Sequence, residues 1–272
     1  MSLAFDPAWL VGALGLLVGL TLAMTGAGGG ALAVPLLVVV AGWTMHQASP
    51  AALTAVGLAA CLGAAQGLRR GLVRWRAAVL LGAIGMVVAP IGVWLAQRTQ
   101  QGLLQLAFVA FMVLTAARVW RDPVPGGAKL GGAPACRRPE GALRLAWSRA
   151  CVGVLTRIGV VAGFTSGLLG VGGGFVIVPA LSRHSNLDLK TIQATSLAVI
   201  ALVSLTGIAS AAWVGQLNPG AAWPFALGAV AGLWVGRAGA HHLPERVVRR
   251  SFAVAALTAA MLLLARTLLG AT

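Results

Sequence analysis

Charged residues are scarce in this chain of 272 residues, and their scarcity indicates the class of protein. Only 9% of the residues are Asp, Glu, Lys or Arg, whereas a soluble domain carries about 25%. Hydrophobic residues make up 59% of the chain, and apolar runs recur that are long enough to cross roughly 30 Å of hydrocarbon. The composition therefore excludes a soluble globular protein. It predicts an all-α polytopic membrane protein in a lipid bilayer.

Acidic residues and cysteines are the rarest groups with chemical reactivity. All five acidic residues fall in predicted loops or chain ends, so no predicted span holds a carboxylate that could relay protons. Backbone carbonyls could still bind sodium, which leaves the coupling ion open. Cys61, Cys136 and Cys151 form no CxxC pair and no metal-binding spacing. We therefore expect three unpaired cysteines, no metal and no cofactor.

Positive charge is abundant by contrast. The formal net charge is +15, which on a soluble protein would suggest a nucleic-acid partner. Here the basic residues gather between apolar spans, where cytoplasmic loops of membrane proteins carry them. We therefore expect no nucleic-acid partner.

Two glycine-rich motifs interrupt apolar runs where helix would otherwise continue. Each consecutive glycine costs a helix roughly 1 kcal/mol relative to alanine, and the proline that follows removes a backbone donor. We therefore predict a broken helix at each motif, followed by a short helix at about residues 30–42 and 174–182. The motif residues are Gly26, Gly28, Gly29, Gly30 and Pro35 in the first copy, and Gly170, Gly172, Gly173, Gly174 and Pro179 in the second.

The two motifs belong to a longer internal repeat. A shift of 144 residues aligns residues 15–37 with 159–181, with identical residues at 10 of 23 positions, where chance would give roughly 2–3. We therefore divide the chain into membrane repeats at residues 1–120 and 149–272. Residues 121–148 are rich in proline and glycine, which predicts a flexible linker.

The distribution of basic residues predicts that the repeats are inverted. If each repeat has five crossing segments, 17 of the 20 Lys and Arg residues fall on one side of the membrane. The alternative, eight spans plus two re-entrant segments, gives a much weaker bias. The preferred arrangement places the linker in the cytoplasm and both termini outside. Inverted repeats with broken helices are typical of transporters that hold substrate near the midplane and work by alternating access.

The paired motifs resemble the TauE/SafE sulfite-exporter family of permeases. The resemblance rests on residues 26–35, on Ser166–Pro179 and on Gln193–Leu197, and it extends over nearly the whole chain. It implies a carrier of small sulfur-containing anions, such as sulfite or sulfonates, in the bacterial inner membrane. A carrier of another small organic anion or of a neutral polar solute is the alternative, and a homodimer is a possible assembly.

The candidate substrate-binding residues begin with the glycines, because free N–H groups at a helix N-terminus bind anions. The glycines could instead serve only close helix packing, as we expect for Gly228, Gly232 and Gly236. Polar residues at the starts of later spans could donate hydrogen bonds to an oxyanion, or could simply cap helices. These polar candidates are Gln47, Ser49, Gln193, Thr195 and Ser196.

Three further groups have a functional and a structural interpretation. Arg157 falls about ten residues into a predicted span, where it could bind substrate or reach the interface. His46 and the pair His241–His242 could relay protons or lie at span ends. Trp234 falls within a span and could line a cavity, whereas the other eight tryptophans flank spans as an interfacial belt.

A membrane enzyme acting on lipids or thiols is the main rival class. It would need a nucleophile and a base, or a metal cluster, within reach of one another. No predicted span combines His with Asp or Glu, and Cys61 and Cys151 are isolated in the sequence. A purely structural role would not require paired helix breaks. We therefore predict a transporter and no enzyme.

Overall fold

The computed structural model describes residues 8–26, 28–121, 136, 148–213, 215, 219–239 and 245–268. Within these residues the chain forms helices joined by short loops, and its sole β-type contact is a bridge between Cys136 and Ser185. Five of the helices are long and apolar enough to cross a membrane. The ten helices are α1 (Ala8–Thr25), α2 (Gly28–Val39), α3 (Met45–Arg69), α4 (Trp75–Arg98), α5 (Gln101–Arg121), α6 (Arg149–Leu169), α7 (Gly174–His184), α8 (Leu189–Trp213), α9 (Pro219–Gly239) and α10 (Glu245–Leu268).

The helices pack with an approximate two-fold symmetry that exchanges the two halves of the chain. The most extensive contacts are between α1 and α9 and between α4 and α6. These two contacts are equivalent, because α6 is the counterpart of α1 in the second half and α9 is the counterpart of α4. The contacts of α3 with α8 and of α5 with α10 lie across the same pseudo-axis. The internal repeat in the sequence is therefore a repeat in space.

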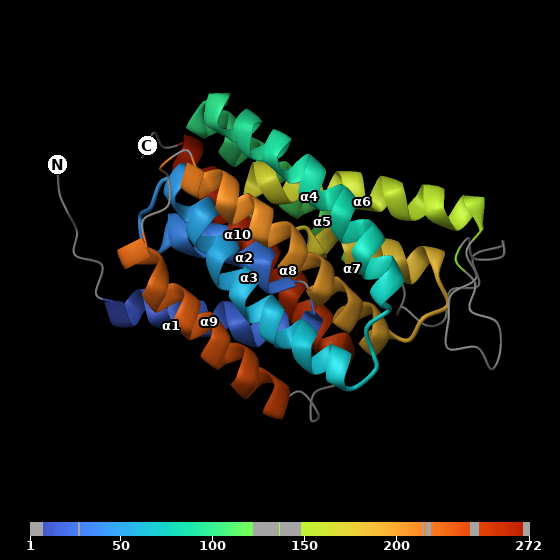
Figure 1. The fold of residues 1–272 in the computed structure, drawn as a ribbon. Helices are drawn as coiled ribbons and strands as arrows, with labels where there is room; N and C mark the ends of the chain where they lie inside the picture. The colour runs from blue at the N-terminus through green and yellow to red at the C-terminus, as the bar shows by residue number, and fades with distance from the viewer. Residues whose placement is uncertain are drawn as a thin grey trace.

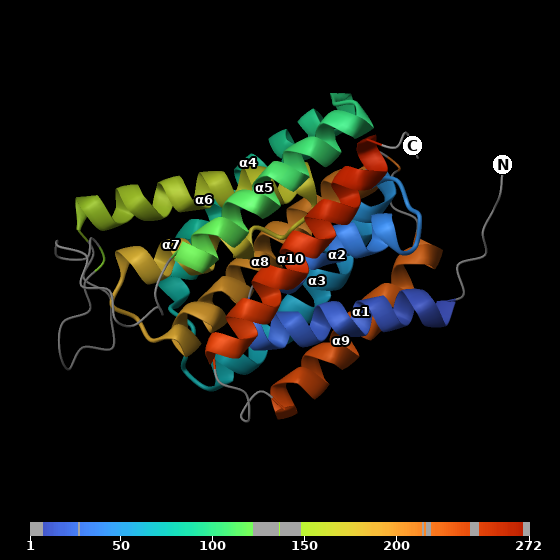
Figure 2. The ribbon, with the colours of Figure 1, turned by 180° about the vertical axis from the view of Figure 1, so that it is seen from behind.

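The two halves run in opposite directions. In Figures 1 and 2, α1 begins at the end of the bundle where α10 finishes, whereas α6 begins at the opposite end, where α5 finishes. In both views α3 begins at the same end as α1, so α2 returns the chain to the side from which α1 started. This is the arrangement of five segments per half that the charge distribution predicts, and the all-α polytopic fold is confirmed.

The apolar core divides into two clusters that do not follow the order of the chain. One cluster joins α4 to α6, α7 and part of α8. The other joins α9 to α1, α2 and α3, with α5 and α10 beside them, and it also includes residues of α7 and α8 such as Phe175 and Ile200. Each half therefore contributes its fourth helix to the core of the other half. We call the group α1, α2, α3 and α9 the first bundle, and the group α6, α7, α8 and α4 the second bundle.

Glycines bring the exchanged helices close together. A Cβ atom at Gly228 or Gly232 of α9 would overlap a backbone carbonyl oxygen of α1, and one at Gly236 would lie 2.7 Å from the Cβ of Ala23. The predicted packing role of these three glycines is therefore confirmed. On the other side of the pseudo-axis, a Cβ at Gly163 would lie 2.6 Å from the Cα of Gly85, where α6 crosses α4.

The prediction that the prolines contribute to the helix breaks is wrong. Pro35 lies inside α2 and Pro179 lies inside α7. Each proline removes a single backbone donor, a loss that membrane helices tolerate when neighbouring groups compensate. The helices are therefore interrupted at the glycines alone.

The prediction of three unpaired cysteines is correct for Cys61 and wrong for the other two. Cys61 is free and exposed, whereas Cys136 and Cys151 form a disulfide with a Cα–Cα distance of 4.8 Å. The backbone N–H of Cys136 also donates to the carbonyl oxygen of His184, at 3.0 Å, at the end of α7. This point of the predicted flexible linker is therefore fixed to two helices. Spacing did not reveal the pair, because a sequence separation of 15 matches no short motif of paired cysteines.

Candidate functional site

The second glycine break is an extended turn between α6 and α7. Gly170 ends α6 in the left-handed conformation, with φ 72°, and its N–H donates to the carbonyl oxygen of Ser166 at 2.9 Å. Gly172 and Gly173 also have positive φ, at 75° and 69°, a region that side chains disfavour. Gly174 begins α7. Because the first turn of a helix lacks intrahelical acceptors for its N–H groups, this break presents backbone donors.

The first glycine break is shorter. Gly26 has φ 72° and donates to the carbonyl oxygen of Leu22 at 2.8 Å, but α2 already begins at Gly28. Gly28 and Gly29, which we predicted to lie in the break, instead belong to the first turn of α2 together with Gly30. Close packing requires glycine at Gly29 and Gly30, because a Cβ at either position would overlap a backbone carbonyl oxygen, of Val18 or of Val171.

Each break packs against the start of a helix from the opposite repeat. A Cβ at Gly26 would lie 2.9 Å from the Cα of Gln193, whose side chain donates to the carbonyl oxygen of Met24 at 3.3 Å. A Cβ at Gly170 would lie 2.8 Å from the Cα of Ser49. The structure thus brings Gln193 and Ser49 to the glycine motifs, as the sequence predicted, with the repeats exchanged.

The two breaks also meet each other at the centre. A Cβ at Gly30 would lie 3.1 Å from the carbonyl carbon of Val171, the residue between Gly170 and Gly172. The motifs are therefore parts of one buried region between the two bundles. They do not form two separate surface sites.

Two of the polar candidates have structural hydrogen bonds. Gln47 is exposed and forms a capping box with Thr44 at the start of α3. The buried hydroxyl of Thr195 donates to the carbonyl oxygen of Thr191 at 2.7 Å and accepts from the backbone N–H of Arg74 at 3.1 Å. For these two residues the structure shows the capping or packing role that we considered as the alternative.

Ser196 differs from its neighbour Thr195. Its side chain is completely buried, and its hydroxyl has no hydrogen-bond partner among the described residues. Ser204, on the same helix, has the same two properties, although the sequence analysis did not single it out. The available signal was its spacing of eight residues from Ser196, which places both on one face of a helix.

Other predicted residues lie away from this region. Arg157 is exposed on α6, and Trp234 is 61% exposed on α9 and so faces outward, contrary to the cavity position that we considered. His46 is half-buried near the start of α3. The pair His241–His242 lies outside the described residues. The described residues contain no cluster of His, Cys, Asp or Glu that could hold a metal ion.

The sequence analysis also missed a polar contact between α9 and α3. Arg237 in the last turn of α9 donates to the side-chain oxygen of Gln66 and, at 3.3 Å, to the carbonyl oxygen of Gly63. It lies on the side of the membrane that the charge distribution assigns to the cytoplasm. An arginine near the end of a span can be predicted to reach the membrane interface. The sequence does not show which neighbouring helix such a side chain contacts.

The voids near the breaks are small. One of about 20 Å³ is lined by His46, Ser49 and Pro50 together with Gly167 of α6, which is room for about one water molecule. A larger depression of about 440 Å³ lies on the exposed flank of α4 and is lined by Trp75, Arg76, Val79, Leu80 and Ala83.

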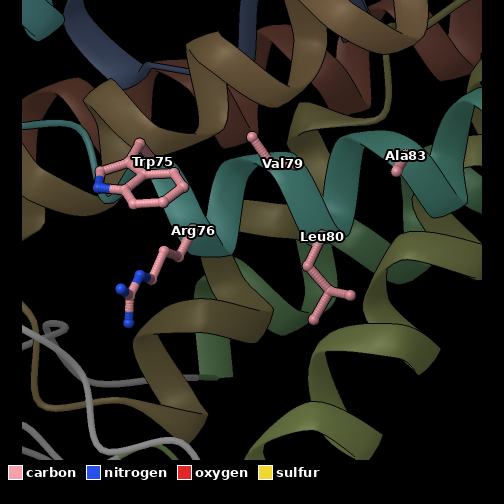
Figure 3. Close-up of a pocket in the computed structure, with 5 residues that line it drawn as sticks. All are labelled: Trp75, Arg76, Val79, Leu80 and Ala83. Carbon is pink, nitrogen blue, oxygen red and sulfur yellow. The ribbon is translucent and has the colours of Figure 1, made fainter.

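The depression on α4 belongs to the outer surface of the bundle. All its lining residues come from one helix (Figure 3), and the side chains of Trp75 and Val79 are more than half exposed. Arg76 stacks on the ring of Trp75 at 5.2 Å, and Arg98 stacks on Trp94 at 4.2 Å near the other end of α4. Tryptophan–arginine pairs at both ends of a span are typical of the two membrane interfaces, so this face is suited to lipid.

Comparison with known proteins places the chain in a family. Two relatives, each named "Probable membrane transporter protein" and each from a strain of Xylella fastidiosa, are 31% identical to it over 189 and 187 residues. These matches cover 69% and 68% of this chain and 67% and 66% of the relatives. The probable membrane transporter protein YunE of Bacillus subtilis is 40% identical over 88 residues, covering 32% of this chain and 30% of that protein.

No solved structure shows a significant match to the chain. The family model described as sulfite exporter TauE/SafE matches residues 11–263, which include both glycine breaks and all ten helices in whole or in part. The protein is therefore a multi-pass membrane protein of the transporter type, and it belongs to the sulfite exporter TauE/SafE family.

Proposed function

We propose that this protein moves small sulfur-containing oxyanions, such as sulfite or a sulfonate, across the membrane by alternating access. The observation that carries the proposal is the reciprocal closure of the two breaks. Gly26 is covered by Gln193 from the second repeat, and Gly170 is covered by Ser49 from the first. A protein whose central backbone discontinuities are each covered by the other repeat has two gates related by symmetry.

The packing of the helices suggests which bodies move. Because each half contributes its fourth helix to the other, we take the first and second bundles defined above as the bodies that move, with the contact between α3 and α8 as the surface between them. Tilting one bundle against the other would separate Gly26 from Gln193 on one side, or Gly170 from Ser49 on the other. Opening one contact while the other stays closed is what alternating access requires.

The chemistry of the breaks favours an anion. Backbone N–H groups at the start of α7 are donors at the positive end of a helix dipole, and the hydroxyls of Ser196 and Ser204 are further donors. Among the described helices the one carboxylate is that of Glu245, the first residue of α10, so none lies in the middle of a span where it would repel a negative charge. A desolvated oxyanion needs several such donors, because a buried charge without partners is very costly.

Reconstitution into liposomes tests the proposal. We expect purified protein to carry labelled sulfite, or one of a panel of sulfonates and thio-compounds, faster than empty vesicles do. Acetate and glycerol, tested in parallel, represent the alternatives of another organic anion and of a neutral solute. If none of the sulfur compounds moves, the proposed substrate class is wrong, and imposed proton and sodium gradients would show whether an ion is coupled.

The orientation in the bacterial inner membrane is part of the same proposal. The loops between α3 and α4 and between α5 and α6, together with the helix ends beside them, contain 11 of the 20 Lys and Arg residues, which favours the cytoplasm for that side. We therefore expect both termini outside. A reporter fused to the C-terminus that is active only in the cytoplasm would contradict this orientation.

A further inference from the structure

We infer that the protein has one oxyanion site rather than two symmetric ones, and that the Ser204 hydroxyl beside the second break is a specificity-determining donor of that site. This inference rests on the proposed function, because it names the residue that would recognise the transported anion. It concerns a side chain that the sequence motifs do not include.

Ser204 lies between the second break and the centre of α3. Its side chain is 0% exposed, and its hydroxyl has no hydrogen-bond partner in the described part of the chain. The hydroxyl oxygen is 3.8 Å from the position that a Cβ would take on Gly172. A Cβ at Gly57 of α3 would lie 2.8 Å from the Cβ of Ser204. The missing side chain at Gly57 leaves room for Ser204. The missing side chain at Gly172 leaves the Ser204 hydroxyl beside the turn that precedes α7.

A serine within a helix ordinarily satisfies its hydroxyl by bonding to a carbonyl oxygen one turn earlier. The neighbouring residues of α8 do so: Thr206 donates to the carbonyl oxygen of Val203 at 2.9 Å, and Ser210 donates to that of Thr206 at 2.7 Å. Ser204 and Ser196 lack such a bond. A buried hydroxyl without a partner destabilises a protein, so a ligand that accepts its hydrogen bond would recover the lost interaction.

Both of these serines lie on the face of α8 that connects the two breaks. Gln193 contacts the first break, and Ile200 and Ser204 contact Gly172 of the second. The positions 193, 196, 200 and 204 recur at helical spacing on one face. They extend over roughly 16 Å at 1.5 Å per residue. This face of α8 therefore places polar side chains along the path from Gly26 in the first break to Gly172 in the second.

The corresponding face of α3 does not provide them. A shift of 146 residues, which aligns Gln47 with Gln193, places Pro50 opposite Ser196 and Leu58 opposite Ser204. Neither residue has a hydroxyl. Thr54, opposite Ile200, already donates to the carbonyl oxygen of Pro50 at 2.8 Å. At these three positions the first repeat therefore has no free hydroxyl to match Ser196 and Ser204, which is why we assign one site.

The ligand class follows from the donors. Backbone N–H groups at Gly172–Gly174 and the Ser204 hydroxyl all donate, and no described side chain beside them is charged. This set suits a compact oxyanion with several acceptor oxygens, such as the pyramidal sulfite ion or the sulfonate group. A carboxylate has fewer acceptor oxygens and should bind more weakly.

The test compares Ser204→Ala with Ser210→Ala, a matched change on the same helix in which the lost hydroxyl bonds only to its own backbone. Sulfite binding is measured on purified protein by isothermal titration calorimetry, and uptake is measured in liposomes. We expect Ser204→Ala to raise the Kd and the KM for sulfite about 10-fold to 100-fold, the range for a hydrogen bond to a charged group. The same variant should melt at an unchanged or higher temperature, because it removes an unsatisfied buried hydroxyl. Ser210→Ala should change neither constant by more than about twofold.

Four outcomes separate this inference from the proposed function. Ser204→Ala with wild-type Kd and KM overturns the inference and leaves transport of sulfur anions standing. Loss of binding together with a lowered melting temperature also overturns it, because a structural role would then explain both. Sulfite binding that depends on Ser204 without any uptake supports the inference while refuting transport, and the absence of both binding and uptake refutes the two together.

Discussion

The two glycine breaks have the same Gly-x-Gly-Gly-Gly sequence and different backbones. In the second break Gly170, Gly172 and Gly173 all have positive φ before α7 begins. In the first break α2 begins two residues after Gly26. A repeated motif therefore does not guarantee a repeated conformation. The surroundings of each copy decide how many of its glycines leave the helix.

The two breaks also differ in the polar side chains that lie beside them. The second break faces α8, whose buried face includes Ser196 and Ser204. The first break faces the second break at Val171 and the start of α8 at Gln193. The positions of α3 equivalent to the two serines are Pro50 and Leu58. An inverted-repeat transporter can thus keep two related gates while placing the polar groups on one of them. The predictions below test this difference between the breaks.

The largest effect is expected from alanine at the third position of each motif. Gly172→Ala forces a side chain into φ 75°, which costs roughly 1–2 kcal/mol and distorts the turn that presents the donors. We expect uptake to fall at least about tenfold. Gly28→Ala changes the first residue of a helix, where alanine is preferred to glycine, and should reduce uptake by less than about threefold. Uptake in liposomes at equal protein content measures both, and equal losses would show that the breaks are equivalent.

The second comparison concerns the glutamines at positions 193 and 47. Gln193→Ala removes the hydrogen bond to Met24 that joins the repeats at the first break. It should raise or lower the KM about threefold to tenfold, because the closed contact is weakened, and it should cost about 1 kcal/mol of stability.

Gln47→Ala removes only the exposed capping box of α3. It should cost about 0.5–1 kcal/mol of stability with a smaller change in KM. Thermal unfolding and uptake kinetics of both variants make the comparison. A larger kinetic effect at position 47 would contradict the assignment of Gln193 to a gate.

The smallest effect on transport is expected from the disulfide, which joins Cys136 to the start of α6 beside the end of α7 and has no counterpart at the end of α2 among the described residues. Replacing Cys136 and Cys151 by serine should lower the free energy of unfolding of oxidised protein by up to about 3 kcal/mol, the loop-entropy value for 15 residues. Uptake should fall less than about threefold.

Counting thiols with a maleimide mass tag checks the pairing directly. Wild-type protein denatured without reductant should take up one tag, at Cys61, and should take up three after reduction. Cys61→Ser provides the control and should take up none and then two. Three tags without reductant, in protein that was never exposed to a reducing agent, would show that the pair does not form.

Much of the fold could be predicted from the sequence because it depends on local or additive properties. Apolar runs bounded by basic residues, as at Arg69 and Arg98, place helix ends to within a few residues. The repeat and the count of Lys and Arg together predict inverted halves. Gln193 and Ser49 could be assigned to the breaks because they follow each motif at a fixed distance.

Other features depend on contacts between distant parts of the chain. Arg157 and Trp234 were candidates because they fall within spans, but the direction in which a side chain points depends on which neighbour packs against its helix. Ser204 was overlooked because a serine within a helix usually bonds to its own backbone. The pairing of Cys136 with Cys151 is a tertiary contact that no short motif in the sequence signals.

The sequence by itself determined the membrane class, the ten helical segments, the inverted repeat and the family, because hydropathy, charge bias and repeated motifs are additive along the chain. Only the tertiary structure decided that the halves exchange their fourth helices, that Gly28–Gly30 remain helical while Gly170–Gly173 do not, and that two serine hydroxyls of α8 are buried without partners. The exchanged helices approach closely at glycines such as Gly228 and Gly163, and Gly30 and Gly57 likewise have no room for a side chain. There the space available to a few atoms outweighs the intrinsic preference of each residue.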